Sequence, residues 1–222
     1  MKAMILAAGR GERLRPLTDT IPKPLLEVKG EALIVRQIKK LKAAGIKEIV
    51  INLAWLGEQI YEFLGNGQTL GVKLEYSKEP PGALEAAGGI IEALPLLDDK
   101  PFIVVNSDIW TDYDYAKLKL KDNFIAHLVL VKNPPHNSHG DFGLDEDILL
   151  MPNKRLPSYT FSGIGIYHPE LFKPYARGSR PLLQVLTSAI DKQQVTGILY
   201  QGTWIDIGTK KRLQAANNLD SW

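Results

Sequence analysis

The first half of the chain alternates apolar runs with amphipathic segments. Four apolar runs predict strands, and their bounds are Met4–Ala8, Glu48–Leu53, Val72–Tyr76 and Phe102–Val105. Three segments with apolar residues at helical spacing predict helices between them, at Ala32–Ala44, Leu56–Leu64 and Glu85–Leu94. This alternation indicates a largely parallel sheet that is covered by helices on both faces, which is an α/β architecture.

The second half of the chain is less regular. Three strands are expected, at Ala126–Val131, Gly163–Tyr167 and Ile198–Tyr200. Two helices are expected, at Pro181–Ile190 and Thr209–Leu219, and the polar stretch PPHNSHGD over residues 134–141 predicts a loop. Since no repeat and no linker composition interrupts the pattern, we expect one domain over residues 1–222.

The composition is that of a soluble protein with a full core. Of the 222 residues, 45% are hydrophobic and 23% are charged. The 27 basic and 25 acidic side chains leave a net charge of only +2, which argues against a nucleic-acid binder with a broad cationic face. Arg10 interrupts the apolar N-terminal stretch, and no run is long enough to span a membrane. We therefore expect a cytoplasmic protein without membrane or nucleic-acid partners.

The stretch LAAGRGERLRPLTDTIPKPLLEVKG follows the first strand directly. Gly9 and Gly11 let the backbone turn sharply and form a concavity for anions. Arg13 adds a forked donor that suits phosphate oxygens, and flanking prolines fix the backbone around Lys23. A glycine turn with solvated arginines would explain the glycines alone, but the added PKP sequence favours a phosphate site. Arg10 and Arg15 are interpreted as loop or surface charges.

Two common phosphate motifs are excluded. A dinucleotide fingerprint needs a third glycine where this chain has Leu14, and a P-loop needs a GK[ST] sequence that is absent here. The sequence therefore predicts a nucleotide site of another kind.

Two aspartates are candidate metal ligands. Asp108 ends the apolar strand in VVNSD, where it could hold Mg²⁺ or cap the next helix. Asp206, in TWIDIG, has apolar neighbours, so it needs a metal or a buried hydrogen-bond partner. Asp112 and Asp114 form a DxD sequence, which glycosyltransferases use for metal, but here they more readily begin a solvated helix.

Two histidines stand in the polar loop. His136 and His139 are three residues apart in a stretch that is rich in Pro, Asn and Ser. Without a third metal-ligating residue nearby, we interpret them as part of a solvated loop.

Taken together, these motifs resemble those of the sugar-1-phosphate nucleotidylyltransferases. The resemblance begins with the first 30 residues and continues through LEAAGGI, VVNSDIW, TFSGIGIYHPELF and GTWIDIGTKKRL. An NPPHxxxGDFGL segment makes the chain most similar to the short bacterial N-acetylmuramate-1-phosphate uridylyltransferases, with the mannose-1-phosphate guanylyltransferases as the alternative. The resemblance implies the Rossmann-like nucleotide-diphospho-sugar transferase fold, a three-layer sandwich with a mixed, mostly parallel sheet. It also implies a monomer or small homo-oligomer.

The resemblance assigns roles residue by residue. Residues 1–110 would mainly bind the nucleotide and residues 111–222 the sugar. The substrates would be a nucleoside triphosphate and a sugar 1-phosphate, with Lys23 and Arg13 as catalytic residues and Mg²⁺ on Asp108 and Asp206. The expected nucleotide-binding residues are Leu6, Ala7, Ala8, Gly9, Gly11, Arg13, Lys23, Glu79, Glu85 and Gly88. Gly143 and Asn153 are expected on the sugar side.

The chain also departs from the family pattern. Ala86 stands in place of a threonine, Ser107 in place of a glycine, and the EKP motif is absent, with Asn153–Arg155 as its possible substitute. A non-catalytic nucleotide-sugar sensor and a DxD glycosyltransferase are the alternative functions. The intact Arg13 and Lys23 and the two aspartates favour the enzyme.

Overall fold

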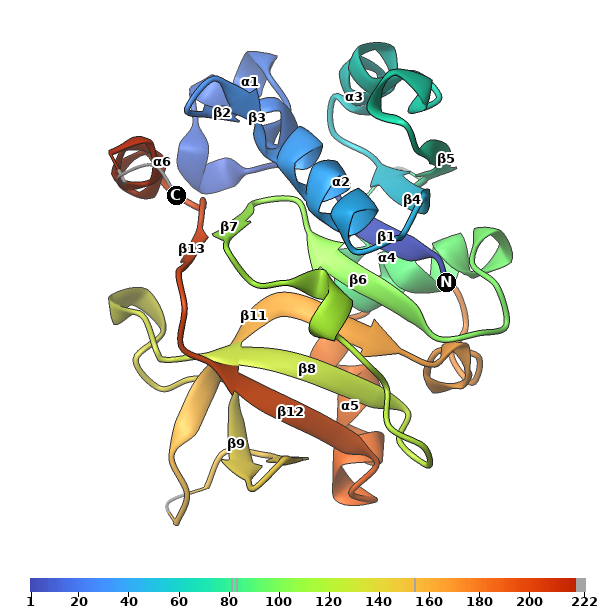
Figure 1. Cartoon of the computed structure of the whole chain (residues 1–222), viewed down its shortest axis with the longest axis vertical. Coiled ribbons are helices and arrows are strands. Elements are labelled where there is room, and N and C mark those ends of the chain that lie inside the picture. The colour runs from blue at the N-terminus through green and yellow to red at the C-terminus, as the bar shows by residue number, and fades with distance from the viewer. Residues whose placement is uncertain (81, 83, 154, 219–222) are drawn as a thin grey trace.

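A mixed sheet forms the centre of the molecule (Figure 1). The computed structural model describes residues 1–80, 82, 84–153 and 155–218. Among them, nine strands pair in the order β5-β4-β1-β6-β11-β8-β12-β10-β9. Their bounds are β1 (Ala3–Leu6), β4 (Glu48–Leu53), β5 (Lys73–Lys78), β6 (Phe102–Asn106), β8 (Ala126–Val131), β9 (Phe142–Asp145), β10 (Ile148–Leu150), β11 (Ser158–Tyr167) and β12 (Val195–Tyr200). The strands β5, β4, β1 and β6 are parallel to one another, as predicted.

Helices cover both faces of the sheet. The helices are α1 (Leu17–Thr20), α2 (Leu33–Ala43), α3 (Gly57–Leu64), α4 (Glu85–Ala93), α5 (Leu182–Asp191) and α6 (Lys210–Asn217). In Figure 1, α2 and α3 lie in front of the sheet and α4 and α5 behind it. Alternate residues of β1 serve the two layers, because Ile5 packs in the cluster with Ile38 of α2, whereas Met4 packs in the cluster with Ile90 of α4. The predicted three-layer sandwich is confirmed.

Strand β11 joins the two halves of the sheet. It runs antiparallel to both β6 and β8, and β12 then pairs parallel to β8. The strand is longer than the predicted Gly163–Tyr167, because it begins at Ser158 and continues through an irregular pairing between Phe161 and Ile164. Gly163 has a φ of +77° at this irregularity, a conformation that favours glycine. The mixed sheet is therefore confirmed, with the parallel pairings separated by β11.

The ends of several elements differ from the expected bounds. Strand β1 ends at Leu6, two residues before the predicted end, so Ala7 and Ala8 belong to the following loop. Helix α6 begins after Thr209, whose side chain accepts a hydrogen bond from the backbone N–H of Arg212. The predicted last residue of this helix, Leu219, lies outside the described residues.

Four very short strands were not predicted from the sequence. Strands β2 (Glu27–Val28) and β3 (Glu31–Ala32) pair with each other, and so do β7 (Ile109–Thr111) and β13 (Trp204–Asp206). Segments of two or three residues are too short for periodicity to show. The β7–β13 pair lies over a small core that includes Leu14, Trp110 and Ile207, so it anchors a late segment of the chain beside the first loop.

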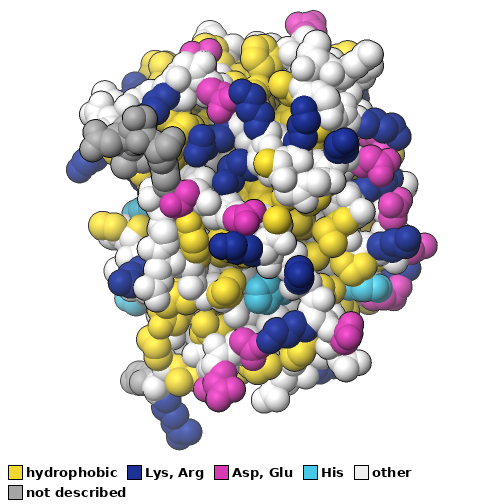
Figure 2. Space-filling view, viewed as in Figure 1, with side chains coloured by type: hydrophobic (Ala, Val, Ile, Leu, Met, Phe, Trp, Pro, Cys, Tyr) yellow, Lys and Arg dark blue, Asp and Glu magenta, His cyan; other side chains and the backbone are white. Residues whose placement is uncertain are grey.

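The surface shows charges of both signs. On the face shown in Figure 2, Lys and Arg side chains are interspersed with Asp and Glu, so this face carries no broad basic field. None of the helices in the described part of the chain is long and apolar enough to cross a membrane.

Candidate active site

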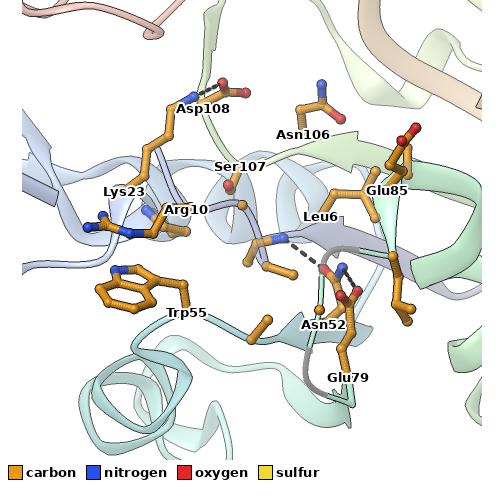
Figure 3. Close-up of a pocket in the computed structure, with 18 of the residues that line it drawn as sticks. Leu6, Arg10, Lys23, Asn52, Trp55, Glu79, Glu85, Asn106, Ser107 and Asp108 are labelled. Atoms are coloured by element: carbon orange, nitrogen blue, oxygen red, sulfur yellow. Dashed lines mark hydrogen bonds and ion pairs between the residues drawn. The ribbon is translucent and has the colours of Figure 1, made fainter. Parts of the chain in front are cut away.

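A cavity of about 730 Å³ opens where β1, β4 and β6 end (Figure 3). The carboxyl ends of parallel strands are the usual ligand-binding edge of such a sheet. The first loop, the end of β4 and the segments before and after α4 form its walls. Its lining includes Leu6, Ala7, Ala8, Gly9, Arg10, Lys23, Asn52, Trp55, Glu79, Glu85, Ala86, Asn106, Ser107 and Asp108.

The glycines of the first loop have two different tasks. Gly9 lines the cavity, and a Cβ atom there would project into open space, so the backbone is accessible to a ligand. Gly11 has a φ of +70°, and an added Cβ would lie 2.9 Å from Cγ2 of Thr18 and 3.3 Å from Cβ of Lys23. Gly11 therefore allows the loop to fold back onto the segment that carries Lys23.

Lys23 points into the cavity and forms an ion pair with Asp108 (Figure 3). It is the first residue of a short 3₁₀ helix (Lys23–Leu25), and Pro22 precedes that helix with an extended backbone. Both partners are mostly buried, with side chains that are 14% and 20% exposed. The fixed backbone and the carboxylate hold the ammonium group at one place in the cavity.

The β7–β13 pair brings Asp206 to Asp108, although the two are far apart in the sequence. Asp206 pairs with Ile109 in the ladder, and the backbone N–H of Ile207 donates to the carbonyl oxygen of Asp108 at 2.7 Å. Oδ2 of Asp206 lies 2.9 Å from Nη2 of Arg212. Burial raises the pKa of Asp206 and the negative charge of Asp108 adds to this, while Arg212 and His136 act in the opposite direction.

These two carboxylates fit a divalent cation. Mg²⁺ commonly binds proteins through one or two carboxylates and completes its coordination with substrate phosphates and water. Oδ1 of Asp206 is buried and, among the described residues, accepts no hydrogen bond, so it keeps a lone pair for such a cation. The same residues contain no group of three or more His, Cys, Asp or Glu side chains arranged for a metal, so this site would need ligand oxygens to complete it.

Arg13 lies beside the aspartate pair rather than in the lining of the cavity. A Cβ atom on Gly208 would lie 2.9 Å from Nη2 of Arg13 and in contact with Nη2 of Arg212. The absence of a side chain at Gly208 thus leaves room for the guanidinium groups of Arg13 and Arg212 beside it. Two such groups close together favour a bound phosphate, because each repels the other without an anion.

Arg10 belongs to the loop after β1, as expected, and the structure adds that it lines the cavity. Its guanidinium stacks on the Trp55 ring at 3.9 Å, donates to the carbonyl oxygen of Thr18 at 2.6 Å and pairs with Asp19. Trp55 Nε1 donates to the same carbonyl at 3.0 Å, so the two side chains form a fixed wall (Figure 3). Arg15 is 58% exposed and is a surface charge, as expected.

A chain of hydrogen bonds joins the first loop to Glu79. Asn52, buried at the end of β4, accepts from the backbone N–H of Ala7 at 2.7 Å and donates to Oε1 of Glu79 at 2.7 Å (Figure 3). Gly89 packs against this pair, since a Cβ there would lie 2.6 Å from Oε1 of Glu79. Burial raises the pKa of Glu79, and the hydrogen bond from Asn52 only partly offsets it. Asn52 therefore fixes an acceptor that faces the cavity.

The raised pKa of Glu79 makes a prediction for stability. Because the folded protein binds this proton more tightly than the unfolded chain does, Glu79 favours folding below its usual pKa of 4.5 and destabilises the fold as the pH rises through its raised value. Gln resembles the protonated side chain and can still accept from Asn52. We expect Glu79→Gln to be more stable than wild type at pH 7 and about equal to it at pH 4. Urea unfolding at both pH values measures this, and a variant less stable at pH 7 would contradict it.

Glu85 and Gly88, both on α4 and both expected to bind the nucleotide, have different surroundings in the structure. Glu85 lines the cavity and has a φ of +59°, an uncommon conformation for a residue other than glycine. Gly88 does not line the cavity. An added Cβ would contact the carbonyl oxygen of Gly178 and lie 3.2 Å from the backbone nitrogen of Arg180, so Gly88 permits close packing behind the site.

We expect Gly88→Ala to destabilise the protein by about 1–3 kcal/mol, the usual cost of overpacking. The added methyl group meets backbone atoms, which have less freedom to move than a side chain. Gly143→Ala is the matched control, because its Cβ would have only ordinary contacts of 3.6 Å or more. Chemical denaturation of both variants measures the difference in the free energy of unfolding. Equal stability would contradict the prediction, because it would show that the backbone around Gly178 moves aside at little cost.

The predicted sugar-side residues lie outside this cavity. Gly143 is in β9 and pairs with Leu150 of β10 and Ser158 of β11. Asn153 accepts hydrogen bonds from the backbone N–H groups of Arg155 and Leu156, at 2.9 and 3.1 Å, and so shapes its own turn. Lys154, in the segment suggested as a substitute for the EKP motif, lies outside the described residues. The sugar roles of Gly143 and Asn153 stay predictions.

The DxD sequence has local partners. Asp114 accepts from the backbone N–H of Ala116 and caps the short 3₁₀ helix Tyr115–Lys117, as the sequence suggested. The Tyr200 hydroxyl donates to Asp112. His136, in contrast, does not simply face solvent, because its Nε2 lies 3.2 Å from Oδ1 of Asp206.

Sequence reasoning did not assign Asn52, Trp55 or Arg212 to the site, and it interpreted His136 as part of a solvated loop. Two of these had a usable signal, since Asn52 is the polar residue in the apolar strand EIVINL and Trp55 follows its carboxyl end. His136 and Arg212 meet Asp206 only through the tertiary fold. No local spacing could reveal them.

Comparisons with known proteins agree with this geometry. The chain matches the nucleotidyl transferase family over residues 2–221. It is 51% identical to an N-acetylmuramate alpha-1-phosphate uridylyltransferase from Neisseria meningitidis, across 99% of this chain and 98% of that protein. It is 30% identical to the mannose-1-phosphate guanylyltransferase catalytic subunit beta of Danio rerio, across 95% of this chain and 62% of that longer protein.

A solved structure shares the fold. A Bacillus anthracis protein assigned as a glucose-1-phosphate thymidylyltransferase superposes with a TM-score of 0.84, covering all of this chain and 97% of that chain at 24% identity. The likeness in fold agrees with the family match and with the nearly full-length similarity to the Neisseria enzyme. The chain therefore belongs to the nucleotidyl transferase family.

Proposed function

We propose that this protein transfers a uridylyl group from UTP to N-acetylmuramate 1-phosphate, releasing pyrophosphate and UDP-N-acetylmuramate. The observation that carries the proposal is the 51% identity, over almost the whole length of both chains, to a relative with that activity. The reaction would serve peptidoglycan recycling in the cytoplasm. The protein would act as a monomer or small homo-oligomer, without nucleic-acid partners.

In the proposed reaction, an oxygen of the sugar phosphate attacks the α-phosphorus of UTP in line, and pyrophosphate leaves. The sugar phosphate is already anionic near neutral pH, so the reaction needs no general base. The main barrier is the repulsion between two anions, which Lys23 would reduce from its fixed place in the cavity. Arg13, beside Gly208, would stabilise charge on the leaving pyrophosphate. The cavity wall of Arg10 and Trp55 would orient the nucleotide.

Asp108 and Asp206 would hold a Mg²⁺ ion. The supporting observations are the β7–β13 pairing that joins them and the free lone pair of Asp206 Oδ1. When bound, Mg²⁺ would neutralise phosphate charge as a Lewis acid. Because Asp108 also pairs with Lys23, the same carboxylate would hold the lysine and the cation next to each other.

The base side of the cavity offers an acceptor. Glu79, oriented by Asn52, can accept a hydrogen bond from a base N–H. Uracil has one such group at N3 and guanine has one at N1, so this contact suits both bases. The mannose-1-phosphate guanylyltransferase relatives make GTP the second candidate, at a lower identity of 30%.

A pyrophosphate-release assay tests the proposal directly. The purified protein is incubated with Mg²⁺ and each pair from a panel of nucleoside triphosphates and sugar 1-phosphates. We expect the highest kcat/KM with UTP and N-acetylmuramate 1-phosphate. A preference for GTP and mannose 1-phosphate would establish the second candidate. No release with any pair, while nucleotide still binds, would indicate a sensor instead.

A further inference from the structure

His136 connects the loop between β8 and β9 to Asp206. It belongs to the loop over residues 132–141, which connects β8 to β9 and contains the short 3₁₀ helix Pro135–Asn137. Its Nε2 lies 3.2 Å from Oδ1 of Asp206, and its side chain is 35% exposed. Arg212, the other cation paired with Asp206, lies 2.9 Å from the second carboxylate oxygen, Oδ2.

A network of side chains fixes this loop against the start of β11. Asn137 Nδ2 donates to Oδ1 of Asp141 at 3.0 Å and to Oγ1 of Thr160 at 3.1 Å. Thr160 Oγ1 donates to Asn133 at 3.0 Å, and the backbone N–H of Phe161 donates to Oδ2 of Asp141 at 2.8 Å. The two ends of the loop are thereby tied to one strand, so the position of His136 is set by the fold.

The Asp206 carboxylate is then contacted on both oxygens. Arg212 lies 2.9 Å from Oδ2, and His136 lies 3.2 Å from Oδ1. The imidazole approaches Oδ1 without completing a hydrogen bond, which leaves a lone pair of that oxygen available. Groups behind a metal-binding carboxylate orient it, and their removal typically lowers metal affinity about 10-fold to 100-fold.

We propose that His136 is a positioning residue that holds the Asp206 carboxylate in the orientation that a divalent cation needs. The contact is one of position, since the ring stands 3.2 Å from Oδ1 and limits how the carboxylate can turn, so the role requires no change of protonation. The inference rests on the metal site of the proposed function. It adds that the sugar-side loop, which leads directly into β9 with Gly143, sets the geometry of the cation site.

Cation binding in the presence of UTP alone gives the sharpest test. Free Mn²⁺ is measured by electron paramagnetic resonance while the protein is titrated, with no sugar phosphate present, so no turnover is involved. We expect His136→Ala to weaken Mn²⁺ binding about 10-fold or more. His136→Gln, which keeps a polar side chain of similar reach beside Oδ1, should recover part of the affinity.

His139→Ala is the matched control. His139 stands in the same loop, but its imidazole contacts the Ser138 hydroxyl, at 3.4 Å, rather than Asp206. We expect its Mn²⁺ affinity to equal that of wild type, and thermal unfolding should show that both alanine variants are folded.

Each other outcome has a distinct meaning. Equal weakening by His136→Ala and His139→Ala would overturn the proposal, because it would show a general effect of the loop. Unchanged affinity in His136→Ala, with tight binding to wild type that Asp206→Asn abolishes, would overturn this inference and leave the proposed function intact. Absence of Mn²⁺ binding to the wild-type complex with UTP would overturn the proposed metal site and this inference together.

Discussion

Lys23→Ala is expected to lower kcat by about 100-fold or more while the fold survives, because the loss of one preorganised charged contact raises a barrier by roughly 3–4 kcal/mol. Lys23 reaches the cavity beside Asp108, where the two anionic substrates would meet. Without its charge, the repulsion between the phosphates has less compensation. Steady-state kinetics of pyrophosphate release measure the effect with the preferred substrate pair.

Lys39→Ala is the control for Lys23→Ala. Lys39 is 61% exposed on α2 and pairs with Glu31, so its loss removes the same charge far from the chemistry. Near-normal turnover is expected in the control. Near-normal turnover in Lys23→Ala would instead refute the catalytic role of Lys23. Arg13 and the two carboxylates would then remain as the groups proposed to lower the barrier.

Asp206→Asn is expected to reduce kcat by about 100-fold and to raise the Mg²⁺ concentration needed for half-maximal activity. Asn keeps an oxygen but loses the charge that attracts the cation, and it leaves Arg212 without its carboxylate partner. Titration of activity with Mg²⁺ separates the two effects, because excess metal should restore only the part that is due to weaker binding.

The fold should tolerate Asp206→Asn. Burial raises the pKa of Asp206, which means that the folded protein holds the ionised carboxylate at a cost in free energy that an amide avoids. Thermal unfolding measures this directly. Asp122→Asn, at an exposed position, controls for the loss of one negative charge, and equal activities of the two variants would contradict a metal-binding role for Asp206.

The sequence predicts best where a segment carries its own periodic pattern. Strand β4 has its predicted bounds, and α2 lies within the predicted Ala32–Ala44. In both, the apolar positions of the segment show directly which of its side chains are buried. The position of the cavity also follows from the sequence, since parallel strands share one ligand-binding edge. Lys23 was predicted in the loop that follows the first strand, and Asp108 at the end of a later strand. The structure brings the two side chains into contact.

Contacts between distant segments could not be predicted in the same way. Arg10 and Arg15 look alike in the sequence, yet only Arg10 meets Trp55, because β4 ends next to the first loop. Gly88 and Gly89 are neighbours, but one faces Gly178 and the other faces Glu79, since helical geometry turns them to different sides of α4. Which of two similar residues lies at the cavity therefore depends on the elements that pack around them.

The pairing of β7 with β13 has a consequence for the order in which the protein becomes competent during synthesis. Chains emerge from the ribosome with the N-terminal part first, so the strands β1, β4, β5 and β6 and the loop with Lys23 are available well before Asp206. An unfinished chain could therefore shape much of the cavity but would lack the second carboxylate of the proposed cation site. The proposed cation site would be completed in one late step, when β13 docks against β7 and brings Asp206 and Arg212 into place together.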